Sequence, residues 1–179
     1  MKHSVFVLVF LVLISCRKNE ARRPKSHTTQ NFYKEVIAHN KRLNKIEDRN
    51  IELLLTKDTI NNYQTSSNGF WYTYISKDTL GNLAPKLDDI VTIKYDIKDV
   101  FDNVIYQAKE VEYKVGKENL IAGIADGVQL MKKGEEMIFI IPSYRAFGVT
   151  GDGDKIKMNK TLKTKIKLID IKQKKNENK

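Results

Sequence analysis

The spacing of the apolar residues changes near Gly69, and this change limits the folds that the chain can adopt. Over 28–60, apolar residues recur at helical spacing, and neither proline nor glycine interrupts them. Within 69–171, apolar and polar residues alternate instead, as in the segment IVTIKYDIK at 90–98. Alternation is the period of a half-buried strand, whereas the earlier spacing is that of a helix. The sequence therefore predicts one long amphipathic helix followed by a mainly β domain.

The expected β domain contains five or six antiparallel strands and one short helix. Strands are predicted at 69–76, 90–98, 104–108, 111–115, 137–141 and 161–171. The short helix is predicted at 119–132, capped by Asn119, because Leu120, Ile124 and Val128 recur at helical spacing. This order of elements indicates the α+β class, with an antiparallel sheet wrapped on a short helix and preceded by the long helix.

The long helix carries an apolar stripe that is interrupted by Asn40 and Asn50. The stripe consists of Phe32, Val36, Leu43, Ile46 and Leu54. A strict coiled coil is not expected from so irregular a pattern. The helix could lie back on the following domain or form a homodimer with a second copy, and the sequence leaves both alternatives open.

An apolar run from Val5 to Ile14 precedes the only cysteine of the chain, Cys16. At 1.5 Å per residue the run reaches about half of a ~30 Å hydrocarbon core, so it is typical of a signal peptide, here 1–15. The four residues Leu13-Ile14-Ser15-Cys16 resemble a bacterial lipobox. We therefore expect an acylated Cys16 that carries palmitate, a lipid-anchored stalk at 16–27, and a membrane protein of the bacterial cell envelope facing the periplasm.

The composition excludes several classes of function. One cysteine and three histidines are too few soft ligands for a transition-metal site, and no metal or cofactor is expected. G-x-S-x-G, Walker and H-E-x-x-H motifs are absent from the sequence, and its net charge of +10 is spread along the chain, so no nucleic-acid site is expected. The acidic pairs at 88–89 and 135–136 are expected to be solvated, and the apolar-free tail 172–179 to be disordered.

Glycines at fixed spacing mark the segment 113–148. The residues of this pattern are Val115-Gly116, Leu120-Ile121-Ala122-Gly123, Gly127, Met131, Gly134, Ile141-Pro142 and Ala146-Phe147-Gly148. In this pattern the chain resembles the FK506-binding protein (FKBP) type of peptidyl-prolyl cis-trans isomerase over about 69–171. Gly123 would let the short helix approach the sheet closely. The chain also resembles the gliding-motility-associated lipoproteins of this family in Bacteroidetes, in its leader, its stalk, its long helix and residues 67–72.

The resemblance implies a pocket that isomerises a proline amide without a cofactor. Rotation of this amide crosses a barrier of ~20 kcal/mol because its resonance must be broken, and an apolar pocket favours the less polar twisted state. Carried over by position, the catalytic and substrate pocket consists of Tyr95, Tyr106, Gln107, Val111, Leu120, Ile121, Ile124, Phe147, Ile156 and Thr164. The Ile121 N–H would bind the substrate carbonyl, and Ile124 would form the floor.

Four of these positions depart from the family pattern. Ile124 stands where the family usually has tryptophan, and Gln107, Phe147 and Thr164 replace an aspartate, a tyrosine and an aromatic residue. Two hypotheses follow. In the first, the protein is a membrane-anchored prolyl isomerase of reduced activity that acts on proline-containing polypeptides, assists the folding of exported proteins and is linked to gliding motility. In the alternative, the domain is a catalytically weak binding module in an envelope assembly.

Overall fold

The computed structural model describes residues 29–77, 83–118 and 120–174. The predicted signal peptide at 1–15, Cys16 with the stalk 16–27, and the end of the tail therefore lie outside the described residues. The chain divides into two compact units, Met1–Ala38 and His39–Lys179, and all contacts described below lie within the second. In the part of the chain that the structure describes, no helix is both long and apolar enough to cross a membrane.

Six antiparallel strands form one sheet in the order β1-β2-β5-β6-β3-β4. They are β1 Gln64–Thr65, β2 Trp71–Ser76, β3 Ile90–Lys98, β4 Val104–Lys114, β5 Glu136–Ile141 and β6 Leu162–Lys172. The predicted α+β class with an antiparallel sheet is confirmed. The two strands expected at 104–108 and 111–115 are one strand, because Lys109 and Glu110 between them pair with β3 and keep the ladder continuous.

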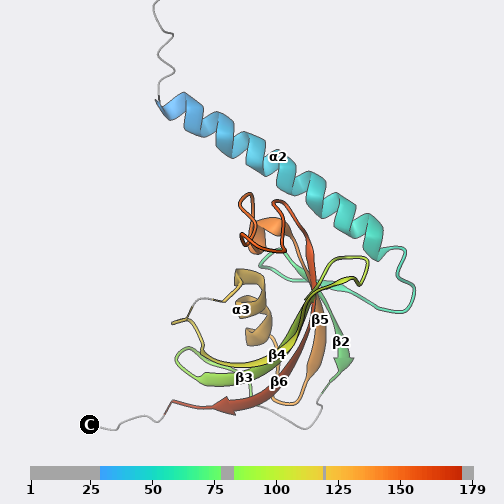
Figure 1. Ribbon diagram of the computed structural model, residues 1–179, viewed down its shortest axis with the longest axis vertical. Coiled ribbons are helices and arrows are strands. Elements are labelled where there is room, and N and C mark those ends of the chain that lie inside the picture. The colour runs from blue at the N-terminus through green and yellow to red at the C-terminus, as the bar shows by residue number, and fades with distance from the viewer. Residues whose placement is uncertain (1–28, 78–82, 119, 175–179) are drawn as a thin grey trace, which may run out of the picture. The chain divides into compact units, whose positions relative to one another are not determined.

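The sheet curves around the short helix α3, Ala122–Gln129, as Figure 1 shows. Val91, Ile93 and Ile97 of β3 are buried in the core beneath this helix, together with Ile124 and Val128 of α3 itself. The helix is shorter than the predicted 119–132. It begins after Ile121, whose ψ of 126° is not helical, and Asn119 lies outside the described residues. At its C-terminal end, residues 130–134 turn toward β5.

Two glycines allow α3 to lie directly on β5. A Cβ added to Gly123 would lie 2.4 Å from Cγ2 of Ile141, and one added to Gly127 would lie 2.8 Å from a ring carbon of Phe139. No larger residue fits at these distances without moving the core. The close approach expected at Gly123 is therefore confirmed.

The long helix α2, Thr29–Leu55, packs on the domain mainly through Ile51, which the predicted stripe did not include. Ile51 is 2% exposed and packs on Trp71 and Ile140, whereas Leu43 and Ile46 of the predicted stripe are exposed. The sequence did not single out Ile51 and Glu47 as contact residues, whereas Leu43, Ile46 and Leu54 of the predicted stripe line a cavity between the helix and the domain. Phe32, Val36 and Leu54 complete the predicted stripe; the first two are exposed and the third is half-buried.

One carboxylate of each acidic pair is buried, contrary to the expectation that both would be solvated. Asp89 is 3% exposed and Glu135 1% exposed. Asp89 accepts a hydrogen bond from the backbone N–H of Lys86 at 2.8 Å, and Glu135 accepts one from the N–H of Lys132 at 2.8 Å. Each buried carboxylate thus closes the turn that precedes a strand.

Candidate functional site

The apolar residues of the predicted pocket gather at the start of α3 and along the loop 142–161, which joins β5 to β6. Ile124 and Ile156 are fully buried in the main core. Leu120, Ile121 and Phe147 pack against the same core but are half-buried. The structure therefore brings five of the predicted residues together, with three of them at the surface.

The remaining predicted residues occupy the neighbouring strands. Tyr95 and Thr164 are buried, and the Thr164 hydroxyl donates to the backbone oxygen of Asp96 at 2.6 Å. Because this hydroxyl is buried and its proton is used within the sheet, it has no proton to donate to a ligand. Val111 is half-buried against the core, and Gln107 is exposed on β4.

The loop 142–161 is closed by its own hydrogen bonds. The backbone N–H of Asn159 donates to the oxygen of Gly148 at 2.7 Å, and Asp152 Oδ1 accepts from the N–H of Ile156 at 2.8 Å. Gly151 has a φ of +70°, and a Cβ there would lie 2.3 Å from the Ile156 oxygen, so only glycine fits. This folding of the loop buries Ile156 in the core.

Tyr106 of β4 fastens the tip of this loop. Its hydroxyl donates to Asp152 Oδ2 at 2.5 Å, and Asp154 Oδ2 lies 3.2 Å away. The hydrogen bond to Asp152 raises the pKa of Tyr106 to about 12 and holds the pKa of Asp152 below its ordinary value. Lys155 Nζ lies 5.2 Å from the centre of the Tyr106 ring. Sequence reasoning placed Tyr106 in the pocket wall but did not find this role for its hydroxyl.

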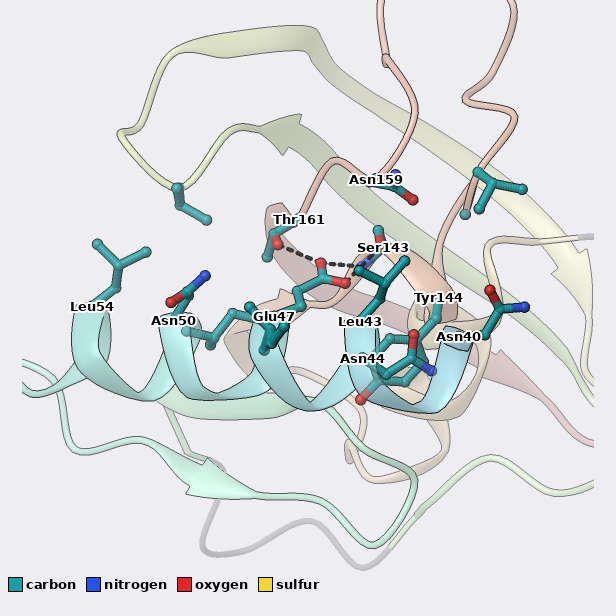
Figure 2. Close-up of a pocket in the computed structure, with 15 residues that line it drawn as sticks. Asn40, Leu43, Asn44, Glu47, Asn50, Leu54, Ser143, Tyr144, Asn159 and Thr161 are labelled. Carbon is teal, nitrogen blue, oxygen red and sulfur yellow. Dashed lines mark hydrogen bonds between the residues drawn. The ribbon is translucent and has the colours of Figure 1, made fainter. Parts of the chain in front are cut away.

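Glu47 of α2 binds both ends of the same loop (Figure 2). Its Oε1 accepts from the backbone N–H of Ser143 at 2.7 Å and from the Thr161 hydroxyl at 2.6 Å. Its Oε2 accepts from the Ser143 hydroxyl at 2.6 Å. Sequence reasoning missed this contact, because Ser143 and Thr161 lie 96 and 114 residues after Glu47 and no local pattern links them to it.

A second hydrogen bond joins α2 to the short 3₁₀ helix η1, Ser143–Arg145. The Tyr144 hydroxyl donates to Asp48 Oδ1 at 2.8 Å. Burial raises the pKa of Tyr144, and the bond to Asp48 raises it further. On its other side, η1 contacts α3 through the ion pair of Arg145 with Asp126.

A cavity of about 440 Å³ lies between α2 and the loop (Figure 2). Apolar side chains contribute most of its surface, among them Leu43, Leu54 and Val149. Four asparagine side chains also line it, namely Asn40, Asn44, Asn50 and Asn159. The loop 142–161 therefore contributes to two apolar surfaces, the predicted pocket at α3 and this cavity at α2.

Residues 81–169 match the family described as FKBP-type peptidyl-prolyl cis-trans isomerase. Over 112 residues the chain is 38% identical to the probable FKBP-type peptidyl-prolyl cis-trans isomerase FkpA of Neisseria meningitidis, a match that covers 60% of this chain and 40% of that protein. It is 32% identical over 96 residues to the macrophage infectivity potentiator of Trypanosoma cruzi, covering 51% of this chain and 48% of that protein. The chain thus spans less than half the length of either relative.

Two solved structures share the fold. A peptidyl-prolyl cis-trans isomerase of Pseudomonas syringae superposes with a TM-score of 0.59 at 19% identity, covering 72% of this chain and 96% of that one. FkpA of Escherichia coli superposes with a TM-score of 0.58 at 20% identity, covering 96% of this chain and 82% of that one. At these identities the likeness concerns the fold alone.

Proposed function

The chain belongs, through its domain at 81–169, to the FKBP-type peptidyl-prolyl cis-trans isomerase family, and from this we propose that it isomerises proline peptide bonds in polypeptide substrates. One structural observation carries the proposal. Ile121 and Phe147, from two different elements, are half-exposed beside the buried Ile124, and all three pack in one apolar cluster. An apolar surface with this composition suits the ring of a proline.

The catalysis proposed for this surface is differential binding of the twisted amide. A planar proline amide carries partial charge on its oxygen, and twisting removes part of that charge. Apolar side chains therefore favour the twisted state over the planar one, which lowers the barrier. Ile121 precedes the first turn of α3, where backbone N–H groups lack acceptors within the helix. Its N–H can donate to a substrate carbonyl and hold the chain during rotation.

The test is the rate of cis–trans exchange of a proline tetrapeptide with the purified full chain in mild detergent. We expect micromolar protein to exceed the buffer rate. Phe147→Glu, which places a charge in the half-buried pocket wall, should lower kcat/KM by at least about tenfold, since it removes the apolar surroundings that favour the twisted amide. Met158→Glu is the control, because Met158 belongs to the same loop but is 66% exposed. A wild-type protein that is folded by circular dichroism and gives no acceleration contradicts the proposal.

The alternative function, a binding module, is favoured by the cavity between α2 and the loop. Its apolar lining and asparagine amides suit an extended uncharged polypeptide segment, since amides both donate and accept hydrogen bonds. The two functions differ in their need for proline. An isomerase pocket requires proline in the peptide, whereas a module that binds through the cavity retains its affinity when the proline is replaced by alanine.

We extend the proposal to the location of the protein. The apolar run at 5–14 and the lipobox-like words before Cys16 support export and lipid anchoring in the cell envelope, facing the periplasm. There the protein would assist the folding of exported polypeptides, and the resemblance to the Bacteroidetes lipoproteins supports a link to gliding motility. A homodimer through α2 belongs to the same proposal. The mass of the N-terminal fragment tests the anchor, since acylation adds the mass of its lipid chains to Cys16.

A further inference from the structure

We propose that Glu47 is a positioning residue of the prolyl pocket, although it lies on α2, outside the family domain at 81–169. Its carboxylate holds both ends of the loop 142–161, and this loop carries the pocket residues Phe147 and Ile156. The inference rests on the proposed isomerase function, because it assigns Glu47 a part in that same site.

Glu47 acts where the strand ladder stops. The last backbone pair between β5 and β6 is Ile141 with Leu162. Beyond this pair the two chains separate into the loop, and Ser143 and Thr161 are the first hydroxyl-bearing residues on either side. The three hydrogen bonds of Glu47, at 2.6–2.7 Å, connect these two residues across the open end. Hydrogen bonds to a charged acceptor are stronger than neutral ones. The Glu47 carboxylate therefore links the two ends of the loop as one more backbone pair between β5 and β6 would.

Ser143 transmits this constraint to Phe147. Its backbone oxygen accepts from the N–H of Ala146 at 2.9 Å and from the N–H of Gly148 at 2.8 Å. These two residues flank Phe147 in the sequence. The Glu47 carboxylate accepts from both the N–H and the hydroxyl of Ser143. It therefore holds the residue whose carbonyl fixes the backbone on both sides of Phe147.

The fold does not depend on Glu47 alone, so its role in the pocket can be separated from stability. The helix is also held by Ile51, packed on Trp71 and Ile140, and by the Asp48–Tyr144 hydrogen bond. Removing the Glu47 charge therefore leaves α2 docked and loosens the loop ends. Wall residues displaced by about 1 Å can lower a rate by orders of magnitude without unfolding the protein.

The experiment compares Glu47→Gln with Glu52→Gln in the full chain, because Glu52 lies on the same helix and is exposed. Glutamine keeps the shape of glutamate but carries no charge, so its oxygen is a weaker acceptor for the Ser143 N–H and the Thr161 hydroxyl, and its Nε2 can bond the Ser143 hydroxyl only if that hydroxyl accepts. We expect Glu47→Gln to lower kcat/KM for a proline tetrapeptide about tenfold at 10 °C, with circular dichroism checking that the variant is folded. Fluorescence of Trp71, the only tryptophan, should keep its wild-type maximum, and Glu52→Gln should match the wild type.

Thr161 supplies a matched pair of variants. Thr161→Val keeps the volume and removes the hydroxyl that Glu47 accepts, whereas Thr161→Ser keeps the hydroxyl. We expect the valine variant to lose activity about fivefold and the serine variant to recover it, since a lost hydrogen bond is worth about 1 kcal/mol, which is a factor of about five in rate. Equal rates for the two variants, or a Glu47→Gln variant as active as Glu52→Gln, overturn the proposal.

Hydrogen exchange separates failure of this inference from failure of the proposed function. We expect the Ala146 and Gly148 amides to exchange faster in Glu47→Gln, while amides of β5 keep their wild-type rates. If the wild-type protein lacks isomerase activity, the proposed function is wrong and the catalytic part of this inference falls with it. Unchanged exchange at both loop amides overturns the positioning role itself.

Discussion

The two helices are held on opposite faces of one sheet by different chemistry. α3 packs on Phe139 and Ile141, whereas α2 packs on Ile140, which lies between them on β5 and points the other way. α3 is held by close apolar packing that two glycines permit. α2 is held by one buried isoleucine and the carboxylates of Glu47 and Asp48. Close apolar packing therefore positions the α3 side of the site, and hydrogen bonds position the α2 side.

Substituting Gly123 gives the largest expected effect, because it disrupts the close packing of α3 on β5. In Gly123→Val the new Cβ would lie 2.4 Å from a core methyl of Ile141. We expect a loss of about 3 kcal/mol in the free energy of unfolding, measured by urea denaturation, since overpacked cores must shift their backbone. The displacement of α3 should also abolish isomerase activity.

Gly134→Ala is the control for Gly123→Val. Gly134 has a φ of +91°, and nothing lies within 4 Å of an added Cβ. Its replacement costs only backbone strain, about 1 kcal/mol. Equal losses for the two variants would show that α3 is not held by close packing, and the contrast between the helices would disappear.

Truncating Ile51 tests the α2 side and gives the second largest effect. Ile51→Ala removes the buried apolar contact of α2 with Trp71 and should cost about 2 kcal/mol, the lower end for buried isoleucines, because the cluster is small. Trp71 fluorescence should shift to longer wavelength as water reaches the ring. Leu53→Ala, at a 56% exposed position of the same helix, should change neither quantity. An Ile51→Ala variant as stable as Leu53→Ala would mean that hydrogen bonds alone hold α2.

The same difference in chemistry explains which parts of the fold the sequence predicts. The alternation in 90–98 and 161–171 and the helical spacing around Ile124 are apolar patterns, and they predicted the strands and α3 within a few residues. The contacting face of α2 includes Glu47 and Asp48, which carry no apolar signal. Hydrophobic spacing therefore predicted the helix but not the residues, Glu47, Asp48 and Ile51, that attach it to the domain.

The residues of the candidate site also differ in whether the sequence could predict them. Ile121, Ile124, Phe147 and Ile156 could be placed by their family positions, and they lie together in one apolar cluster. Glu47 could not be found, because its partners are about a hundred residues away and its role depends on geometry that only the folded chain creates. The hydrogen bonds of Tyr106 could not be found either, because its partners Asp152 and Asp154 lie 46 and 48 residues further along the chain.

The smallest expected effect concerns Tyr106, whose hydrogen bond fastens the loop to β4 and to neither helix. The raised pKa of Tyr106 means that this bond contributes fully below pH 10 and is lost as the pH rises toward about 12. The lowered pKa of Asp152 means that the bond contributes above about pH 4 and weakens as the pH falls further. The contact therefore persists between these two limits, and because both residues are only half-buried, screening by solvent keeps its effect on stability small.

Absorbance at about 295 nm, where tyrosinate absorbs and the neutral phenol does not, measures this contact directly. Tyr106→Phe should remove one phenol that titrates near pH 12, leaving the titration below pH 10 unchanged. Asp152→Asn should move the pKa of Tyr106 back toward 10, because it removes the charge that stabilises the protonated hydroxyl. If the difference between wild type and Tyr106→Phe instead titrates at pH 10, the tip of the loop is not held by β4. The loop would then depend on α2 and α3 alone, and the position of Phe147 would rest still more heavily on Glu47.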